Sequence, residues 1–342
     1  MTRYLFYISL LFLISCGTSS ISVNVQRPAD ISVPQNIQDV IIANRSVAGK
    51  GNITKNIVEG FFSGEGIGAD KKGSEYCVMG LSQMLSSSDR YNLKNTGEIS
   101  LDGTGTSSFP DLLSWKKVQR ICDSYGADAL IVLATFDSDS RVVEGKPVIR
   151  KKKVKGEQVK ETRFPVTLIM DIESGWRIYD AHQKKIIDVN KFTEVKEYVS
   201  WGSSYNDARI KLPSKRHSLK ESGILAGEKY GFRISPIWVN VSRTYFASKE
   251  EKFKLAKSCV KLGDWDGAIG FWKDMTSHDN IKLSRRAYFN LAVAAEVKGQ
   301  LDVALEYAKK SRDLGEKRAV SYIKTLNSRK QDEIRLKEQL NN

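Results

Sequence analysis

The chain has 342 residues, a formal net charge of +14 and four cysteines. Its length accommodates two domains of ordinary size, and its basic balance favours anionic partners or surfaces. After the first residues no further apolar run is long enough to cross a bilayer, which excludes a protein with several membrane-spanning helices.

The first residues have the layout of a secretory signal peptide. Arg3 supplies a short positive region, and the apolar run over residues 4–14 is short for a membrane span. The run ends in a segment that resembles the lipobox of bacterial lipoproteins: Leu13, Ile14, Ser15 and Cys16. We therefore expect residues 1–15 to be removed and Cys16 to carry lipid. An ordinary signal peptide or a weak transmembrane anchor is the alternative.

The residues after Cys16 indicate which membrane holds the chain. Position 17 is Gly17 rather than the aspartate associated with retention at the inner membrane, and residues 18–22 lack the acidic run that resembles a surface-export signal. We expect an outer-membrane lipoprotein that faces the periplasm. Since export removes the chain from nucleic acid, and no motif for binding it is present, we expect no nucleic-acid partner.

Taken in chain order, residues 16–36 predict a lipidated tether, and residues 37–247 predict a mixed α/β domain. Residues 39–43 and 129–134 are apolar runs typical of buried strands, and helical spacing of apolar residues over 74–85 indicates a helix between them. A second helix is predicted through Tyr125, with Asp111 or Ser114 as its N-terminal cap. Alternating strands and helices are the pattern of a layered α/β unit.

The next stretch predicts antiparallel strands. Residues 142–150 and 159–172 are extended-type runs joined at a turn that Gly156 permits. Further strands are expected at 175–180, 186–188 and 192–198, helices around 204–212 and 214–226, and a strand at 237–241 that closes the sheet. The predicted fold class is α+β: an N-terminal mixed α/β sheet domain with a long antiparallel hairpin, then a C-terminal all-α domain.

The hairpin is the most strongly charged segment of the chain. Residues 141–160 carry eight basic residues against two acidic ones. The central basic cluster consists of Arg150, Lys151, Lys152, Lys153 and Lys155. A run of this kind is usually a solvated face. The alternative is contact with anionic headgroups or an acidic partner, which a membrane tether would favour.

Residues 248–342 contain an internal repeat. Three positions recur 36 residues later: Gly263, Trp265 and Ala268 correspond to Gly299, Leu301 and Ala304. The pattern looks like a pair of tetratricopeptide repeats, in which Gly permits the turn and Ala lies where two helices cross. The usual spacing is about 34 residues. Such stacks bind partner proteins in many families, and packing against the first domain is the alternative.

Other chemistry-bearing patterns are weak. Gly64, Gly66 and Gly68 invite comparison with phosphate loops, but the spacing differs from GxGxxG and no GK[ST] follows. Asp137 and Asp139 could hold a hard cation, although a turn, a helix cap or a solvated pair is favoured. The three histidines are far apart, and no nucleophile motif is present. We expect no cofactor and no metal.

Three cysteines lie beyond the proposed lipid site. Cys77, Cys122 and Cys259 are widely spaced in segments with helical patterns, so a disulfide framework is not expected. Buried free thiols are the favoured interpretation, and Cys77 with Cys122 is the one pair worth testing.

Five segments carry a family resemblance: residues 22–25, 27–30, 64–73, 168–180 and 215–232. Together they resemble an uncharacterised lipoprotein family found mainly in Bacteroidetes, a domain of unknown function with a tetratricopeptide-like tail. The resemblance implies no activity and no catalytic residues. The first part of the chain also looks distantly like envelope assembly lipoproteins that combine strand-helix units with a basic hairpin.

These observations lead to one functional expectation and two alternatives. The chain is expected to be a non-enzymatic envelope lipoprotein that binds or scaffolds a partner through its helical repeats. The first alternative is a subunit of an envelope secretion or assembly complex that self-associates through the hairpin. The second is a nucleotide- or metal-dependent enzyme, which would rest on the Gly-rich loop and the carboxylates alone.

Overall fold

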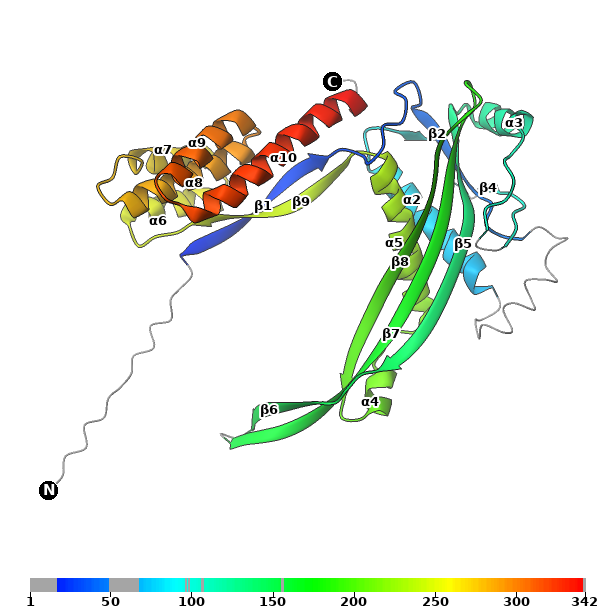
Figure 1. Cartoon of the computed structure of the whole chain (residues 1–342), viewed down its shortest axis with the longest axis horizontal. Helices are drawn as coiled ribbons and strands as arrows, with labels where there is room; N and C mark the ends of the chain where they lie inside the picture. The colour runs from blue at the N-terminus through cyan, green and yellow to red at the C-terminus, as the bar shows by residue number, and fades with distance from the viewer. Residues whose placement is uncertain are drawn as a thin grey trace. The chain divides into compact units, whose positions relative to one another are not determined.

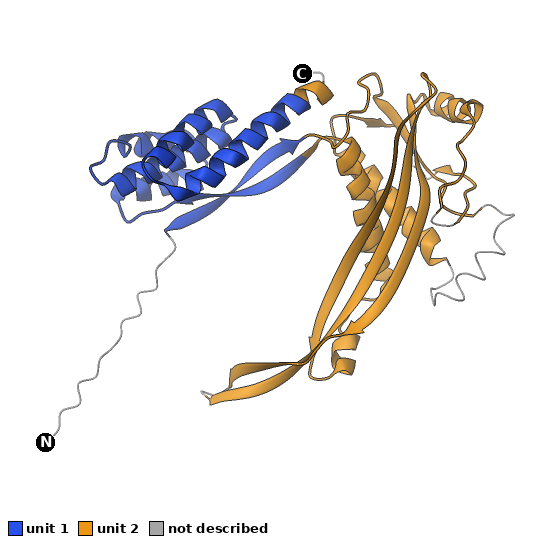
Figure 2. Cartoon of the chain, in the orientation of Figure 1, with its two compact units in different colours: residues 1–27, 238–335 blue, residues 28–237, 336–342 orange. Residues whose placement is uncertain are grey.

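The computed structural model describes residues 17–48, 68–95, 97, 99–105, 108–154 and 157–340. The chain divides into two compact units, each built from two separate stretches of sequence (Figure 2). Unit 1 comprises Met1–Arg27 and Trp238–Arg335, and unit 2 comprises Pro28–Ile237 and Leu336–Asn342. A sheet-rich region precedes a series of helices, which confirms the predicted α+β class.

Within the described residues, unit 2 is organised around a sheet of seven strands (Figure 1). They are β2 (Asp39–Asn44), β3 (Asn92–Leu93), β4 (Ile99–Ser100), β5 (Ala129–Glu144), β6 (Val148–Val154), β7 (Glu157–Asp180) and β8 (Lys185–Gly202). Strand β2 pairs in parallel with β3, β4 and β5. Strand β7 pairs antiparallel with β5, β6 and β8, so the sheet is mixed and contains a hairpin of β6 and β7. The run predicted as one strand over residues 142–150 is divided, because β5 ends at Glu144 and β6 begins at Val148.

The apolar run of β5 is buried on both faces of the sheet. Leu133 faces the larger hydrophobic core of unit 2, whereas Val132 faces a smaller core on the opposite side. Burial on both faces requires a continuous apolar run, which is the pattern from which this strand is predicted. After a bulge between Leu133 and Thr135, Phe136 returns to the larger core, and the rest of β5 becomes progressively exposed towards Glu144.

Helices α2 (Ala69–Ser86) and α5 (Lys215–Ile234) pack against the face that carries the larger core. Glycines allow their backbones to approach closely. The glycines at this contact are Gly80, Gly223, Gly227 and Gly231. A Cβ atom at Gly227 would lie 1.9 Å from the carbonyl oxygen of Cys77, so this position admits no side chain.

Helix α3 (Trp115–Tyr125) contributes to the smaller core on the opposite face. Ser114 caps its N-terminus, because the Ser114 side chain accepts a hydrogen bond from the Lys117 amide at 3.3 Å. Cys122 of α3 lies in the smaller core and Cys77 of α2 in the larger core, so the sheet separates the two thiols. Both are free and buried, which confirms the expectation for this pair.

Unit 1 contains the C-terminal helices. Among the described residues these are α6 (Glu251–Lys261), α7 (Trp265–Asp274), α8 (Ile281–Val297), α9 (Leu301–Asp313) and α10 (Lys317–Leu340), whose last turn belongs to unit 2. Short turns make two helical hairpins, α6 with α7 and α8 with α9. The predicted helical character of this part of the chain is confirmed.

Unit 1 also contains a two-stranded sheet of β1 (Thr18–Arg27) and β9 (Ile237–Phe246). The sequence pattern places residues 18–27 in a tether and residues 237–241 in the main sheet, and both expectations are wrong. The physical reason is burial: Val25 is 2% exposed, and Phe246 packs into the core of the helices. Ile21 of β1 packs against the same core, so β1 and β9 pair with each other in unit 1 rather than with an edge of the main sheet.

The end of α10 is anchored within unit 2. The Gln339 side chain accepts a hydrogen bond from the Ala29 amide at 2.8 Å and donates one to the Ala29 carbonyl at 3.1 Å. Because these bonds are buried, specific contacts within unit 2 hold the last turn of α10 in place. Among the described residues, no helix combines the length and the apolar content that a membrane span requires.

Candidate functional site

The candidate site is a two-stranded ribbon at one end of the unit 2 sheet (Figure 1). We define the ribbon as β6 together with residues 157–163 of β7. Strand β8 pairs with β7 only from Phe164 onward, so both outer edges of the ribbon lack strand partners among the described residues. A two-stranded hairpin by itself is marginally stable in water. The ribbon therefore depends on contacts at its root.

Helix α4 (Tyr205–Ile210) holds the root of the ribbon. The Tyr205 hydroxyl donates a hydrogen bond to the Gly145 carbonyl at 2.8 Å, and Arg209 forms an ion pair with Glu144 at 2.6 Å. These contacts fix the loop between β5 and β6. They connect the ribbon to the part of the sheet that α2 and α5 stabilise.

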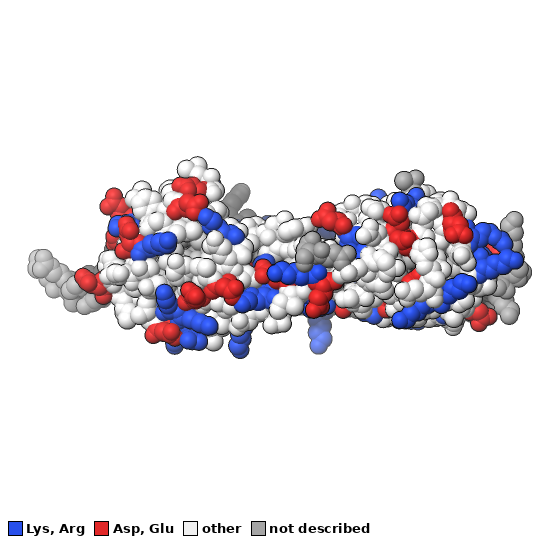
Figure 3. All heavy atoms as spheres, turned by 90° about the horizontal axis from the view of Figure 1, so that it is seen from above, with Lys and Arg blue, Asp and Glu red and all other residues white. Residues whose placement is uncertain are grey.

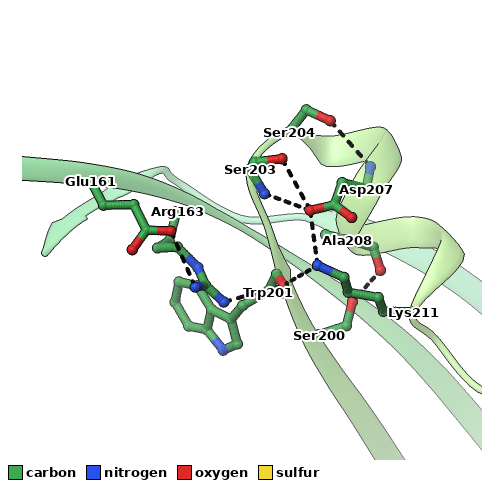
Figure 4. A network of polar contacts seen from close by, with 9 residues as sticks. All are labelled: Glu161, Arg163, Ser200, Trp201, Ser203, Ser204, Asp207, Ala208 and Lys211. Carbon is green, nitrogen blue, oxygen red and sulfur yellow. Dashed lines mark hydrogen bonds and ion pairs between the residues drawn. The ribbon is translucent and has the colours of Figure 1, made fainter. Parts of the chain in front are cut away.

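A second set of contacts at the root is shown in Figure 4. Asp207 accepts hydrogen bonds from the Ser203 amide and from the Lys211 ammonium group, both at 2.8 Å. These bonds lower the pKa of Asp207 to about 2, with the Lys211 contact as the largest cause. Arg163 donates to the Trp201 carbonyl at 3.4 Å. Basic groups at the root are therefore occupied in holding the strands together.

The strand register divides the ribbon into two chemically different faces. Alternate residues of a strand point to opposite faces, and residues directly opposite on an antiparallel pair share a face. The lysine face carries Ile149, Lys151, Lys153, Gln158, Lys160 and Thr162. The mixed face carries Val148, Arg150, Lys152, Glu157, Val159, Glu161 and Arg163. The lysine face thus has no acidic residue, whereas the mixed face has both signs of charge.

The two faces also differ in their partners. On the mixed face, Arg163 forms an ion pair with Glu161 at 3.4 Å, and the Arg150 guanidinium lies 5.4 Å from the centre of the Trp201 ring. On the lysine face, neither Lys151 nor Lys160 makes an ion pair or a side-chain hydrogen bond with any described residue. Charge on the lysine face is therefore available to an external partner.

The structure separates the basic residues that the sequence groups together. Arg150 and Lys152 lie on the mixed face, Lys151 and Lys153 lie on the lysine face, and Lys155 lies outside the described residues. Sequence reasoning missed Lys160 and Ile149 as members of the lysine face. Pairing the two runs about a turn at residues 155–156 and assigning alternate residues to each face would have identified both.

The predicted repeat positions lie at the turns and contacts of the helical hairpins. Gly263 and Gly299 adopt the left-handed backbone conformation at the two equivalent turns, with φ of +78° and +73°. Ala268 and Ala304 are fully buried, as a close helix crossing requires. Leu301 is buried, and Trp265 is half-buried against the same core. The two hairpins therefore share their turn geometry.

One pair of aromatic residues on this unit escaped sequence analysis. Tyr288 of α8 and Tyr307 of α9 are half-buried, and their ring centres are 6.3 Å apart. The Lys310 ammonium group lies 5.9 Å from both ring centres. Partly exposed tyrosines backed by a packed core are common at the centres of protein interfaces.

The acidic residues of β5 do not assemble a metal site. Asp137 and Asp139 lie within the strand, opposite Glu173 and Asp171, so the interpretation as a turn or a helix cap is wrong. Arg141 forms an ion pair with Asp171. Among the described residues, no group of three or more potential ligands is arranged to hold a metal ion.

One nearby carboxyl has an unusual environment. Asp70, in the first turn of α2, accepts a hydrogen bond from the Ser138 hydroxyl at 2.7 Å. Burial, assisted by Asp137 and Asp139, raises the pKa of Asp70 to about 6. Because the folded chain binds this proton more tightly than the unfolded chain, the contribution of Asp70 to stability is fully present below pH 4. It is lost as the pH rises through 6.

We expect Asp70→Asn to stabilise the chain by up to about 3 kcal/mol at pH 7.5 and by less than about 1 kcal/mol at pH 4. Asparagine keeps the acceptor for Ser138 and removes the buried charge. Loss of the favourable interaction between a carboxylate and the helix N-terminus, about 0.3–1 kcal/mol, reduces the gain. Urea unfolding at both pH values measures the change in stability, with Asp89→Asn at an exposed position of the same unit as the control. Equal effects at both pH values would contradict the assignment.

Two further features of the chain are a hollow beside α3 and the Gly-rich segment. A shallow hollow of about 570 Å³ is lined by residues of α3 and by Lys184. In the space-filling view of Figure 3, Lys and Arg side chains gather at the right-hand end of the face that is drawn. Its lining combines three basic side chains, Lys116, Arg120 and Lys184, with the carboxylate of Asp123. Cys16 and most of the Gly-rich segment lie outside the described residues. Gly68 alone is described, as the residue before α2.

Comparisons with known proteins place most of the chain in families without an assigned activity. A family model described as "Domain of unknown function (DUF8603)" matches residues 37–246, and one described as "Domain of unknown function (DUF6340)" matches residues 254–336. A search of curated proteins gave no match. One similar solved structure is a neuraminyllactose-binding hemagglutinin homolog from Helicobacter pylori. It has 11% identity, covers 59% of this chain and 80% of its own, and has a TM-score of 0.21.

Proposed function

We propose that this chain, which belongs to the family described as "Domain of unknown function (DUF8603)", is a non-enzymatic binding or scaffold protein of the cell envelope. Lipid on Cys16 holds it in the outer membrane, facing the periplasm, and its helical unit binds a partner protein. We also propose that the chain is a lipoprotein of a type found mainly in Bacteroidetes. The signal-peptide layout and the lipobox-like segment before Cys16 support the anchor.

The observation that carries the binding role is the pair of similar helical hairpins in unit 1. Their equivalent turns at Gly263 and Gly299, 36 residues apart, support an assignment to tetratricopeptide-like repeats. Repeats of this kind present side chains from adjacent helices on one continuous surface. The surface that we propose for the partner centres on Tyr288 and Tyr307, which come from adjacent helices and remain partly exposed.

The anchor can be tested directly. The full-length chain is expressed in a Gram-negative host, and the N-terminal peptide is analysed by mass spectrometry in the wild type and in Cys16→Ser. We expect the wild-type peptide to begin at Cys16 and to carry acyl chains, and the variant to lose them and leave the membrane fraction. A wild-type N-terminus without lipid rules out this part of the proposal.

The binding role is tested by cross-linking in native envelopes. We expect Tyr288→Ala with Tyr307→Ala to lose a partner that the wild type retains, because truncating such residues typically weakens binding by about 2 kcal/mol or more, or about 30-fold. Leu262→Ala, at a side chain that is 85% exposed, is the control. Truncation after Ser248 is unsuitable because it removes the helices that cover Phe246. A partner retained by the tyrosine variant would count against the proposal.

A second candidate function is supported by the free edges of the ribbon. Unpaired strand edges expose backbone donors and acceptors to which another copy could add a strand. In this alternative the chain is a subunit of an envelope secretion or assembly complex. Sedimentation of the purified protein over a wide concentration range tests it. A monomer at the highest concentration disfavours the alternative.

A further inference from the structure

We propose that the lysine face of the ribbon docks on a bilayer containing anionic phospholipid. The inference rests on the proposed envelope location for the presence of such a membrane nearby. It adds a second membrane contact, distinct from lipid on Cys16, and assigns it to Lys151, Lys153 and Lys160.

The first argument is the charge arrangement across the ribbon. The register places Lys151 directly opposite Lys160, and like charges in this position destabilise a strand pair. The opposite arrangement occurs on the other face, where Arg150 lies opposite Glu161. No acidic residue shares the lysine face, so the described chain does not relieve the repulsion. An anionic surface would relieve it, and would bring all three lysines into favourable contact.

The second argument is the apolar residue beside the lysines. Ile149 is 66% exposed and lies on the same face, one strand repeat from Lys151. An exposed aliphatic side chain flanked by long lysines suits the boundary between headgroups and acyl chains. There the aliphatic group enters the apolar layer while the lysine stems extend to the headgroups.

The third argument favours a membrane over an acidic protein. Arginine has a planar guanidinium that binds carboxylates through two parallel hydrogen bonds, and it is enriched at protein interfaces. Both arginines of the ribbon, Arg150 and Arg163, lie on the mixed face, where they have partners in the chain. The lysine face offers compact ammonium charges without fixed geometry, which suits a surface of diffuse negative charge.

The test measures vesicle binding by the chain from residue 16 onward with Cys16→Ser. This protein keeps every described residue and carries neither signal segment nor lipid. Vesicles consist of phosphatidylcholine alone or with about one third phosphatidylglycerol. The variant is Lys151→Ala with Lys153→Ala and Lys160→Ala. The control is Lys116→Ala with Lys117→Ala and Arg120→Ala, which removes the same charge from exposed positions on α3. Circular dichroism confirms that both variants fold.

We expect the wild type to bind anionic but not neutral vesicles, and to dissociate when salt is raised to about 0.5 M. Each lysine at an anionic surface contributes about fivefold to partitioning, so the ribbon variant should bind about 100-fold more weakly while the α3 variant binds nearly as the wild type does. The inference is overturned if the wild type ignores anionic vesicles, or if the two variants lose binding equally. It is also overturned if the lysines capture an acidic protein without any vesicle binding.

The outcome separates this inference from the proposed function. Vesicle binding through the lysine face, combined with an unlipidated Cys16 in the native protein, would support the ribbon contact and reject the anchor. A lipidated Cys16 with no vesicle binding by the Cys16→Ser protein would leave the anchor in place and reject the ribbon contact.

Discussion

The substitution Gly227→Ala is expected to destabilise unit 2 by about 3 kcal/mol, which corresponds to a fall of about 6–12 °C in Tm. The added Cβ atom would lie 1.9 Å from the Cys77 carbonyl oxygen and 2.7 Å from the Leu81 amide nitrogen. Both neighbours are backbone atoms of α2, so no side-chain rotation can relieve the overlap. The two helices must separate, and the core between them and the sheet then loses contacts.

Differential scanning calorimetry of the full chain measures this effect. The matched control is Gly270→Ala on α7, where an added Cβ atom would have no described neighbour within 4 Å outside its own helix backbone and adjacent residues. That change should stabilise its helix by about 0.5–1 kcal/mol, because alanine restricts the unfolded chain more than glycine does. If Gly227→Ala melts at the wild-type temperature, the close contact between α2 and α5 is not present in solution.

The substitution Glu296→Ala is expected to destabilise unit 1 by about 3–5 kcal/mol. The Glu296 carboxylate is buried, and it accepts two hydrogen bonds from Arg243 at 2.7 and 2.8 Å. It also accepts bonds from the Tyr322 hydroxyl at 2.6 Å and from Arg329 at 3.2 Å. Removing the Glu296 carboxylate leaves two largely buried positive charges and a hydroxyl without this common acceptor. A buried charge without its partner is the main source of the free-energy cost when a buried ion pair is broken.

Hydrogen exchange resolved by mass spectrometry shows which part of the chain is destabilised. Exchange of backbone amides should be faster in α8, α10 and β9 of the variant and unchanged in the unit 2 sheet. Burial and the neighbouring carboxylate raise the pKa of Tyr322, so this hydroxyl remains a donor at neutral pH. The control is Asp266→Ala, which breaks a surface ion pair with Lys298 and should cost less than about 1 kcal/mol. Equal costs for the two substitutions would show that the buried network adds no stability.

Local patterns were sufficient to predict the main elements of the fold. The continuous apolar run at 129–134 requires burial on both faces, and β5 is buried on both. Glycine and extended-type runs predicted the hairpin of β6 and β7. Helical spacing predicted α2, and the repeat around Gly263 and Gly299 predicted the C-terminal helices. Each of these signals depends on residues that are close in sequence.

The candidate surfaces were predicted less completely. The sequence identified the basic run at residues 150–155, but it treated the run as one patch. The register then assigned Arg150 and Lys152 to one face and Lys151 and Lys153 to the other. Lys160 and Ile149 joined the lysine face only through this pairing. A shift of the register by one residue would have changed the members of each face, because side chains alternate along a strand.

By itself, the sequence determined the fold class, the basic hairpin and the paired helices, because apolar periodicity and turn residues act over a few residues. The tertiary structure alone decided that β1 pairs with β9 across more than 200 residues of sequence, and that Glu296 meets Arg243 and Tyr322. These contacts depend on which distant apolar surfaces are buried together. The spacing of apolar residues within one strand does not determine its partner, because the same alternating strand can pair with any free edge that covers its apolar face.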